Sequence, residues 1–183
     1  MSELPLTLSL DKFTYKEYKD WPEDFRCELI DGIIYKKLSK TIRHQRIIGD
    51  LCVQLPDFFK DSGVVPVLGP FDIRLFPKED YSDDTVLQAD FILVCDQKKL
   101  EDDRFCKGPP ELVIEIIDED TKLFDLVVKK NLYQKAGVKE YWLIGIDAVK
   151  LYRFVPDFIE LTYFLAESRE IKSLIFPGLV LRF

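Results

Sequence analysis

Residues 111–117 read Glu-Leu-Val-Ile-Glu-Ile-Ile, an apolar run that Glu115 interrupts in its second half. Leucine, isoleucine and valine on both sides of this acid predict a strand covered on both faces, as in a sheet flanked by helices. An ionised carboxylate on such a strand costs several kcal/mol unless another group pairs with it. We therefore interpret Glu115 as a buried acid with a function rather than as a surface group.

A second acid precedes this strand in the chain. Residues 87–95 read LQADFILVC and predict another buried strand, which carries Asp90 near its start. Considered alone, Asp90 is better interpreted as an acid at the solvated end of a strand. The two acids together, each on an otherwise apolar strand, indicate a shared site.

The segment after the strand of Glu115 predicts a helix, with Asp120 or Thr121 as its cap. Lys129 belongs to this helix and lies four residues after Asp125, so the two side chains can meet on one side of it. Two positions are open for the lysine: an exposed ion pair with Asp125, or a position that points back across the sheet toward Glu115.

The rest of the chain predicts a mixed fold. A hairpin is expected with its tight turn at Asp31-Gly32, followed by a helix from Ser39 or Thr41 that Pro56 kinks or ends. Further elements are expected at residues 11–20 (a short helix), 64–76 (one or two strands), 139–146 (a buried strand) and 149–155, 158–164, 171–176 and 179–183 (short antiparallel strands), with loops at 77–84 and 96–110. We expect an α/β (α+β) fold with a central mixed sheet flanked by helices, β-rich additions at both ends, and a single domain over residues 1–183.

The composition limits the class of protein. The chain has 183 residues, 47% of them hydrophobic and 32% charged, which predicts a soluble globular protein. No apolar run approaches the length of a membrane span, and no secretory signal is visible at the start. The four cysteines form no CxxC pair, which argues against zinc and for reduced thiols in the cytoplasm. The net charge of −7 argues against broad affinity for nucleic acid, so any such binding must rest on a local site.

The acids and the lysine suit one kind of chemistry. Asp90 and Glu115 offer hard oxygen ligands for Mg²⁺ or Mn²⁺, and Lys129 offers a nearby cation, which together meet the needs of metal-dependent phosphodiester cleavage. Glu28 is a further candidate, with a polar position on the open face of the hairpin as the alternative. The only histidine, His44, is expected on the polar side of its helix as a surface or capping side chain.

Several segments, in order along the chain, resemble one known family. They are RCELIDGIIYKK (26–37), a helix that carries His44, PFDIRL (70–75), QADFILV (88–94), PELVIEIIDEDT (110–121), the spacing Asp125-x-x-x-Lys129-x-x-x-Tyr133, GVKEYWLI (137–144) and FPGLVLRF (176–183). Over roughly residues 14–183 the chain is similar to the Uma-two group of putative restriction endonucleases, within the PD-(D/E)XK nuclease superfamily.

The resemblance implies both a fold and a set of site residues. It implies a central mixed sheet flanked by helices, in which Asp90 matches the first acid of the superfamily motif and Glu115 the second. Glu28 matches the early acid of the family's ELIDG motif. The simplest superfamily pattern places the lysine where this chain has Ile117, but this group is thought to supply it from the next helix, and Lys129 matches that position.

Other positions match the family or depart from it. His44, Asp125 and Tyr133 match recurrent family positions. Ala89 replaces the proline that usually precedes the first acid. Asp118 stands where the family usually has a serine, and it adds a negative charge that either supplies another metal ligand or alters the chemistry.

We therefore predict a metal-dependent endonuclease that cleaves nucleic acid, with DNA preferred as the substrate and Mg²⁺ or Mn²⁺ as the cofactor. The alternative is a catalytically inactive nucleic-acid-binding or assembly module on the same fold. A purely structural domain, whose acids are satisfied by hydrogen bonds and Lys129, is also open. A homodimer is plausible if some aromatic residues of the C-terminal strands are exposed: Tyr152, Phe154, Phe158, Tyr163 and Phe164.

Overall fold

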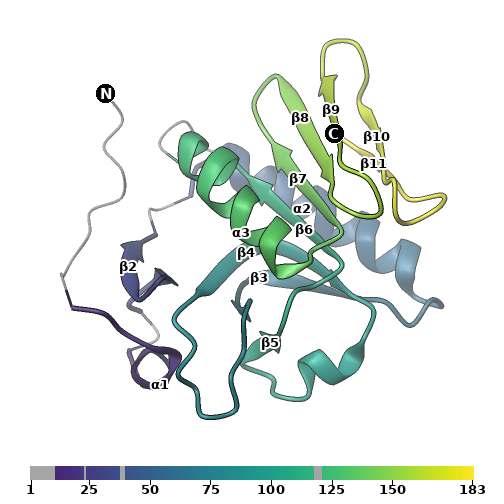
Figure 1. The fold of residues 1–183 in the computed structure, drawn as a ribbon. Helices are drawn as coiled ribbons and strands as arrows, with labels where there is room; N and C mark the ends of the chain where they lie inside the picture. The colour runs from purple at the N-terminus through teal and green to yellow at the C-terminus, as the bar shows by residue number, and fades with distance from the viewer. Residues whose placement is uncertain (1–10, 23, 38–39, 118–120) are drawn as a thin grey trace.

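A computed structural model describes residues 11–22, 24–37, 40–117 and 121–183 (Figure 1). Three residues to which the sequence assigned a role, Ser39, Asp118 and Asp120, lie outside the described residues. None of the described helices is both long and apolar enough to cross a membrane.

One large mixed sheet forms the centre of the fold. Its strands are β1 (Cys27–Ile30), β2 (Ile33–Lys36), β3 (Val65–Arg74), β4 (Val86–Val94), β5 (Phe105–Lys107), β6 (Leu112–Ile116), β7 (Glu140–Ile144), β8 (Ala148–Arg153) and β9 (Ile159–Phe164). The main path runs β2-β1-β4-β6-β7-β8-β9, with β3 paired to β4 and β5 paired to β3. The pairs β6–β7 and β3–β5 are parallel, and the other pairs are antiparallel. A separate hairpin joins β10 (Glu170–Lys172) to β11 (Val180–Arg182).

Helices cover both faces of this sheet (Figure 1). The helical elements are α1 (Tyr15–Tyr18), α2 (Ile42–Phe59), η1 (Gln97–Leu100), η2 (Phe124–Lys129) and α3 (Lys130–Ala136). One core lies between the sheet and the η2–α3 segment, and a second lies between the sheet and α2 together with the β10–β11 hairpin. The prediction of a mixed α/β fold with a central sheet flanked by helices is therefore confirmed.

The long helix α2 follows the predicted apolar stripe. Leu51, Leu55 and Phe59 are buried against the sheet, whereas the neighbouring Phe58 is 42% exposed. Thr41 caps the helix, because its side chain accepts a hydrogen bond from a backbone N–H of the first turn. The helix ends one turn after Pro56, so the proline is accommodated close to the C-terminal end and does not stop the helix at once.

The tight turn between β1 and β2 forms as predicted. Asp31 and Gly32 both have positive φ angles, 51° and 81°, which suits a two-residue hairpin turn. Two other expectations need correction. The helix expected at residues 11–20 is only four residues long, and the predicted charged loop at residues 96–110 contains β5, which pairs with β3.

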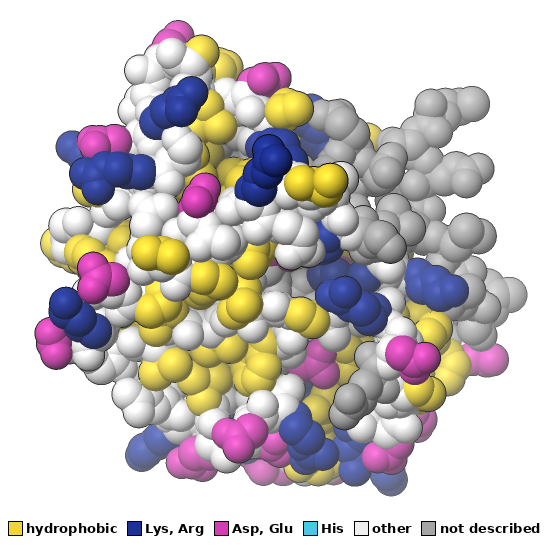
Figure 2. All heavy atoms as spheres, turned by 180° about the vertical axis from the view of Figure 1, so that it is seen from behind, with side chains coloured by type: hydrophobic (Ala, Val, Ile, Leu, Met, Phe, Trp, Pro, Cys, Tyr) yellow, Lys and Arg dark blue, Asp and Glu magenta, His cyan; other side chains and the backbone are white. Residues whose placement is uncertain are grey.

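The face seen from behind, where α2 lies, is mixed in character (Figure 2). Apolar side chains form a broad area in the middle of this face, and charged side chains lie mainly around it. Large hydrophobic residues that are strongly exposed include Val53 on α2 and Leu68 on β3.

Candidate active site

The two edges of β4 differ in how they pair with neighbouring strands, and the site lies where one edge is left unpaired. One edge pairs with β3 along its length, whereas the other pairs with β1 at Val86 and with β6 from Phe91 onward. In the gap between β1 and β6, the main chain of Gln88 bonds to side chains instead of a strand. Its N–H donates to Glu28 Oε1 at 2.8 Å, and its carbonyl accepts from Lys37 Nζ at 2.5 Å. We call this gap the fork.

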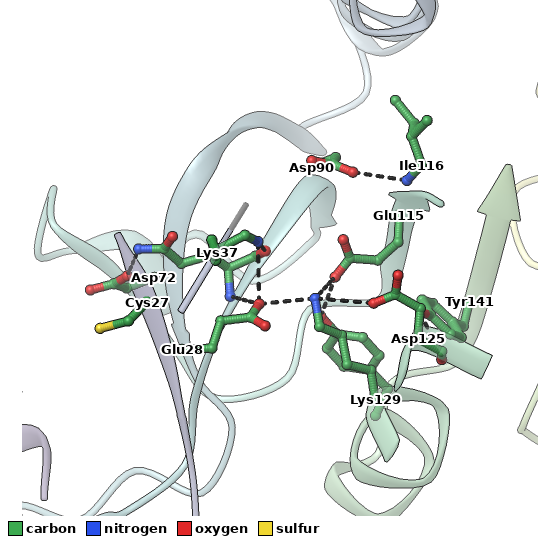
Figure 3. Close-up of polar contacts among 12 residues, drawn as sticks. Cys27, Glu28, Lys37, Asp72, Asp90, Glu115, Ile116, Asp125, Lys129 and Tyr141 are labelled. Carbon is green, nitrogen blue, oxygen red and sulfur yellow. Dashed lines mark hydrogen bonds and ion pairs between the residues drawn. The ribbon is translucent and has the colours of Figure 1, made fainter. Parts of the chain in front are cut away.

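The ammonium group of Lys129 brings three carboxylates together at the fork (Figure 3). Its Nζ atom lies 2.9 Å from Glu28 Oε1, 2.9 Å from Glu115 Oε1 and 3.4 Å from Asp125 Oδ1. Lys129 is only 3% exposed, so these are not surface ion pairs. The lysine thus meets Asp125 on its own helical segment and also points back to Glu115 on β6.

Lys129 is the last residue of a π-helical segment, where the sequence predicted one continuous α-helix. The segment η2 has the wider π geometry, and the α-helix α3 follows it from Lys130. Such segments are rare and occur often at functional sites. One turn further along, the Tyr133 hydroxyl donates to Glu115 Oε1 at 3.1 Å. The helical segment therefore directs an amine and a hydroxyl at the same carboxylate.

Asp90 lies at the fork beside Glu115, but its other contacts lead toward α2. Its Oδ2 atom accepts a hydrogen bond from the Ile116 N–H at 2.8 Å, so the carboxyl group reaches the main chain next to Glu115. Its Oδ1 atom lies 3.0 Å from His44 Nε2 and 3.3 Å from Lys40 Nζ. The two acids are therefore neighbours across β4 and β6, although each is held by a different helical segment.

The prediction for His44 was wrong. The residue is 2% exposed and its ring faces Asp90, rather than lying on the polar surface of α2. A helical periodicity reports which residues face the sheet along most of a helix. At the first turn, however, the helix meets the fork, and a polar partner there makes burial of a polar ring favourable.

The pKa values of the Glu115 and Asp90 carboxyl groups are shifted in opposite directions. Burial raises the pKa of Glu115 to about 7; Lys129 opposes this rise, and the charge of Asp90 adds to it. Burial acts on Asp90 in the same direction, but the hydrogen bond from His44 and the charge of Lys40 outweigh it and hold the pKa below its usual range. Paired acids with pKa values pushed apart are typical of functional sites.

The pKa values of the remaining groups at the fork are shifted by burial and by Lys129. Burial opposes ionisation of Glu28, but Lys129 and Lys37 lower its pKa. Burial also opposes the charge on Lys129, yet Glu115, Glu28 and Asp125 raise its pKa well above the ordinary value. Burial and then Glu115 raise the pKa of Tyr133, and burial raises that of Asp125. Lys129 is therefore a fixed cation at neutral pH.

A cavity of about 200 Å³ opens beside the fork and has Asp90 in its lining. The lining also contains the cationic side chains of Arg26, Lys37 and Lys40, together with His44. A local basic cleft thus exists on a chain whose net charge is −7. Arg26, Lys37 and Lys40 were not predicted as site residues. In the sequence, lysine and arginine next to a hairpin are typical of an ordinary solvated surface.

The acids suit a metal that needs few protein ligands. Among the described residues, no group of three or more His, Cys, Asp and Glu side chains could hold a metal ion. Mg²⁺ is usually bound through one or two carboxylates, with waters and substrate phosphates as the other ligands. Asp90 and Glu115 fit this requirement, and a cation between them would counteract the burial and the Asp90 charge that raise the pKa of Glu115.

The fold matches that of a solved structure described as a putative nuclease belonging to DUF820 from Anabaena variabilis ATCC 29413. The two chains share 19% sequence identity with a TM-score of 0.62, and the match covers 81% of this chain and 84% of the other. The fold is thus one that a nuclease-like protein adopts. The family model Uma2, described as putative restriction endonuclease, matches residues 15–183, and the chain belongs to this family. A comparison with curated proteins gave no match.

Proposed function

We propose that this protein is a metal-dependent endonuclease that hydrolyses phosphodiester bonds, with the fork as its active site. The observation that supports this most is that Asp90 accepts a hydrogen bond from the N–H of Ile116, the residue after Glu115, with Lys129 2.9 Å from Glu115 and a basic cleft beside Asp90. Membership of the Uma2 family agrees with this chemistry. So does the resemblance to the PD-(D/E)XK nucleases, in which two acids and a lysine act together.

In this proposal Asp90 and Glu115 hold Mg²⁺ or Mn²⁺. The metal would supply Lewis-acid polarisation of the scissile phosphate and lower the pKa of a bound water. Asp90 suits the role because its low pKa keeps it ionised at neutral pH. Glu115 must lose its proton to serve as a ligand, so metal binding and its deprotonation are linked. Asp118, if it also contributes, would add a third acid.

Lys129 would act as an electrostatic group and not as a base. Its pKa is raised well above the ordinary value, so it keeps its proton at neutral pH. A fixed cation can stabilise the negative charge that develops on a phosphate during hydrolysis. Glu28, Asp125 and Tyr133 would position it and Glu115, because each contacts one of the two.

The substrate is proposed to be DNA, bound through the basic cleft. Arg26, Lys37 and Lys40 line this cleft and would contact backbone phosphates. Since the net charge of the chain is −7, binding should depend on these few cations and weaken as salt is added. His44 would hold Asp90 in place from the side of the cleft.

Cleavage assays on single- and double-stranded DNA and on RNA, with Mg²⁺ or Mn²⁺, test the proposal. Glu115→Gln and Lys129→Met should each lower cleavage by at least 100-fold (about 2.7 kcal/mol). Glu160→Gln is the matched control, because Glu160 is an exposed acid on β9 paired with Lys150. Activity that survives both site substitutions would remove the fork from the mechanism.

One observation favours the alternative of an inactive nucleic-acid-binding module. Lys129 already pairs with Glu28, Glu115 and Asp125, so part of the charge of these acids is compensated without a metal. Calorimetric titration with Mn²⁺ separates the two functions. Binding that Asp90→Asn abolishes supports the endonuclease, whereas DNA binding without any metal binding supports the inactive module.

The other predictions on the whole protein remain proposals. One sheet contains strands from both halves of the chain, which supports a single domain over residues 1–183. The described cysteines are all free thiols, which suits a cytoplasmic location. Of the five C-terminal aromatic residues, Phe158 and Phe164 are 52% and 54% exposed and could contribute to a homodimer. Sedimentation at micromolar concentration tests the dimer, and a monomeric mass would exclude it.

A further inference from the structure

A second, larger cavity of about 720 Å³ lies next to the proposed active site. Its aromatic lining consists of Phe13, Trp21 and Phe25, all partly exposed. The lining also contains the cationic residues Arg26, Lys36 and Lys37. Among the described lining residues, Asp24 is the one acid. The cavity has the size of a small-molecule site, which typically spans about 300–1,000 Å³.

The three aromatic rings are arranged as walls and not as a stack. Trp21 meets Phe13 at a centroid distance of 5.4 Å and an angle of 78°, and it meets Phe25 at 5.6 Å and 71°. Stacked rings would cover one another's faces, whereas edge-to-face contacts leave part of those faces uncovered. Trp21 also contacts Tyr18 at a centroid distance of 5.2 Å and an angle of 51°, so a further planar group would meet the parts of the three rings that stay exposed.

This cavity is continuous in its lining with the cleft beside Asp90. Arg26 and Lys37 line both, and Lys37 also reaches Glu28 and the Gln88 carbonyl at the fork. A phosphate held between these two cations would have the fork on one side and the aromatic walls on the other. A nucleotide is a planar base joined to such a phosphate.

We propose that the cavity binds one unpaired nucleobase of the substrate, next to the phosphate at the fork. Bases inside a duplex are stacked on their neighbours, so an aromatic side chain can reach the face of a base only in a single strand or an unpaired segment. The protein would therefore act on single-stranded nucleic acid or on unpaired positions. This inference rests on the proposed function for the identity of the neighbouring site, but not for binding itself.

Binding without divalent metal tests the cavity separately from cleavage. A twelve-nucleotide single strand and a duplex of the same length are titrated in EDTA, with tryptophan fluorescence as the signal. Trp21 is partly exposed whereas Trp142 is fully buried, so a bound base should quench chiefly Trp21. We expect the single strand to bind at least 10-fold more tightly than the duplex. Equal binding of the two would overturn the proposal.

Variants identify the residues responsible. Trp21→Ala should weaken single-strand binding by about 10-fold or more, and Trp21→Phe should retain most of it, because stacking on an aromatic ring contributes strongly to single-strand affinity. Phe58→Ala, at an exposed aromatic residue on α2, should change nothing. Lys36→Glu, at the exposed last residue of β2, should also weaken binding, because it reverses a charge on the cavity wall. Unchanged binding in Trp21→Ala or Lys36→Glu would contradict the proposal.

The outcomes also separate this inference from the proposed function. Cleavage that requires Glu115, but is indifferent to Trp21→Ala and to strand pairing, would leave the nuclease standing and refute the base site. Binding to single strands that requires Trp21, without any cleavage in Mg²⁺ or Mn²⁺, would support the base site and refute the nuclease.

Discussion

Lys129 Nζ lies 2.9 Å from Glu28 Oε1, and this contact joins the N-terminal hairpin to the helical segment that follows β6. Both side chains are almost completely buried. The pair spans the fork, the gap along β4 between its pairing with β1 and its pairing with β6. A buried ion pair of this kind adds little net stability, but losing one partner is costly because the other charge stays behind.

Replacing Lys129 by methionine should therefore destabilise the protein strongly. Glu28, Glu115 and Asp125 would be left buried without their shared cation, and we expect a loss of about 3–5 kcal/mol in the free energy of unfolding. Urea denaturation at pH 7 measures the change. Lys60→Met is the control, since Lys60 is an exposed residue paired with Asp57, and it should shift stability by less than about 0.5 kcal/mol. A similar small shift for Lys129→Met would show that the acids are not held by the lysine.

The raised pKa of Glu115 predicts a specific dependence of stability on pH. Its pKa is about 7 in the folded protein, whereas the ordinary value of 4.5 applies to the unfolded chain. The folded protein therefore binds this proton more tightly than the unfolded chain does. The resulting stabilisation is present at low pH and is lost as the pH rises from about 4.5 to about 7. Glu115→Gln cannot ionise, so the stability difference between the two proteins should change across this window. Glu160→Gln should follow the original protein, and parallel curves for Glu115→Gln would contradict the assigned pKa.

Two glycines provide a matched pair of variants for testing the close approach of β3 to β4 next to Asp90. A Cβ atom at Gly69 would lie 2.0 Å from the Ala89 carbonyl oxygen, so Gly69→Ala must push β3 away from β4 beside Asp90. We expect a loss of about 1–3 kcal/mol, as for overpacked cores. A Cβ atom at Gly49 in α2 would meet nothing within 4 Å, and Gly49→Ala should stabilise the helix by about 1 kcal/mol. Thermal unfolding of both variants tests the pair, and equal effects would refute the close approach at Gly69.

Replacing Glu140, the first residue of β7, should affect stability through lost hydrogen bonds. The residue is fully buried; its Oε1 atom accepts a hydrogen bond from Trp142 Nε1, and its Oε2 atom accepts from the N–H groups of Leu174 and Ile175. Glu140→Ala would leave the Trp142 indole N–H and the Leu174 N–H without their acceptor, at a cost of about 1–3 kcal/mol for each, whereas the Ile175 N–H keeps the Ser173 hydroxyl oxygen at 3.2 Å. Hydrogen exchange should accelerate at residues 174 and 175 more than in β7. Uniform acceleration across the protein would instead indicate a global loss of stability.

The sequence predicted the strands and the hairpin well, because their signals are local. The apolar runs around Asp90 and Glu115 and the Asp31-Gly32 turn each depend on a few adjacent residues. β5 was missed because three residues in a charged segment carry no such pattern, and only pairing with β3 makes them a strand. The π-helical geometry of η2 was missed for a similar reason, since periodicity does not distinguish it from an α-helix.

The candidate site was predicted in part. The burial pattern singled out Glu115, and the spacing along the next helix left Lys129 with two possible positions. The exposed ion pair with Asp125 was wrong, because Lys129 is buried and contacts Glu115 and Asp125 together. Two features could not be read from the sequence: the burial of His44 and the presence of Lys37 at the fork. Both depend on how α2 and the hairpin approach β4, and this tertiary arrangement leaves no trace in local composition.

The fork also determines how the chain could be divided. Glu28 and Asp90 precede the loop around η1, between β4 and β5, whereas Glu115 and Lys129 follow it. A break in that loop would give two fragments, each with half of the acids and only one with the lysine. Neither piece could hold the constellation alone, so any activity would have to be restored by complementation, and the reunion of the fragments could serve as an on-switch for the enzyme.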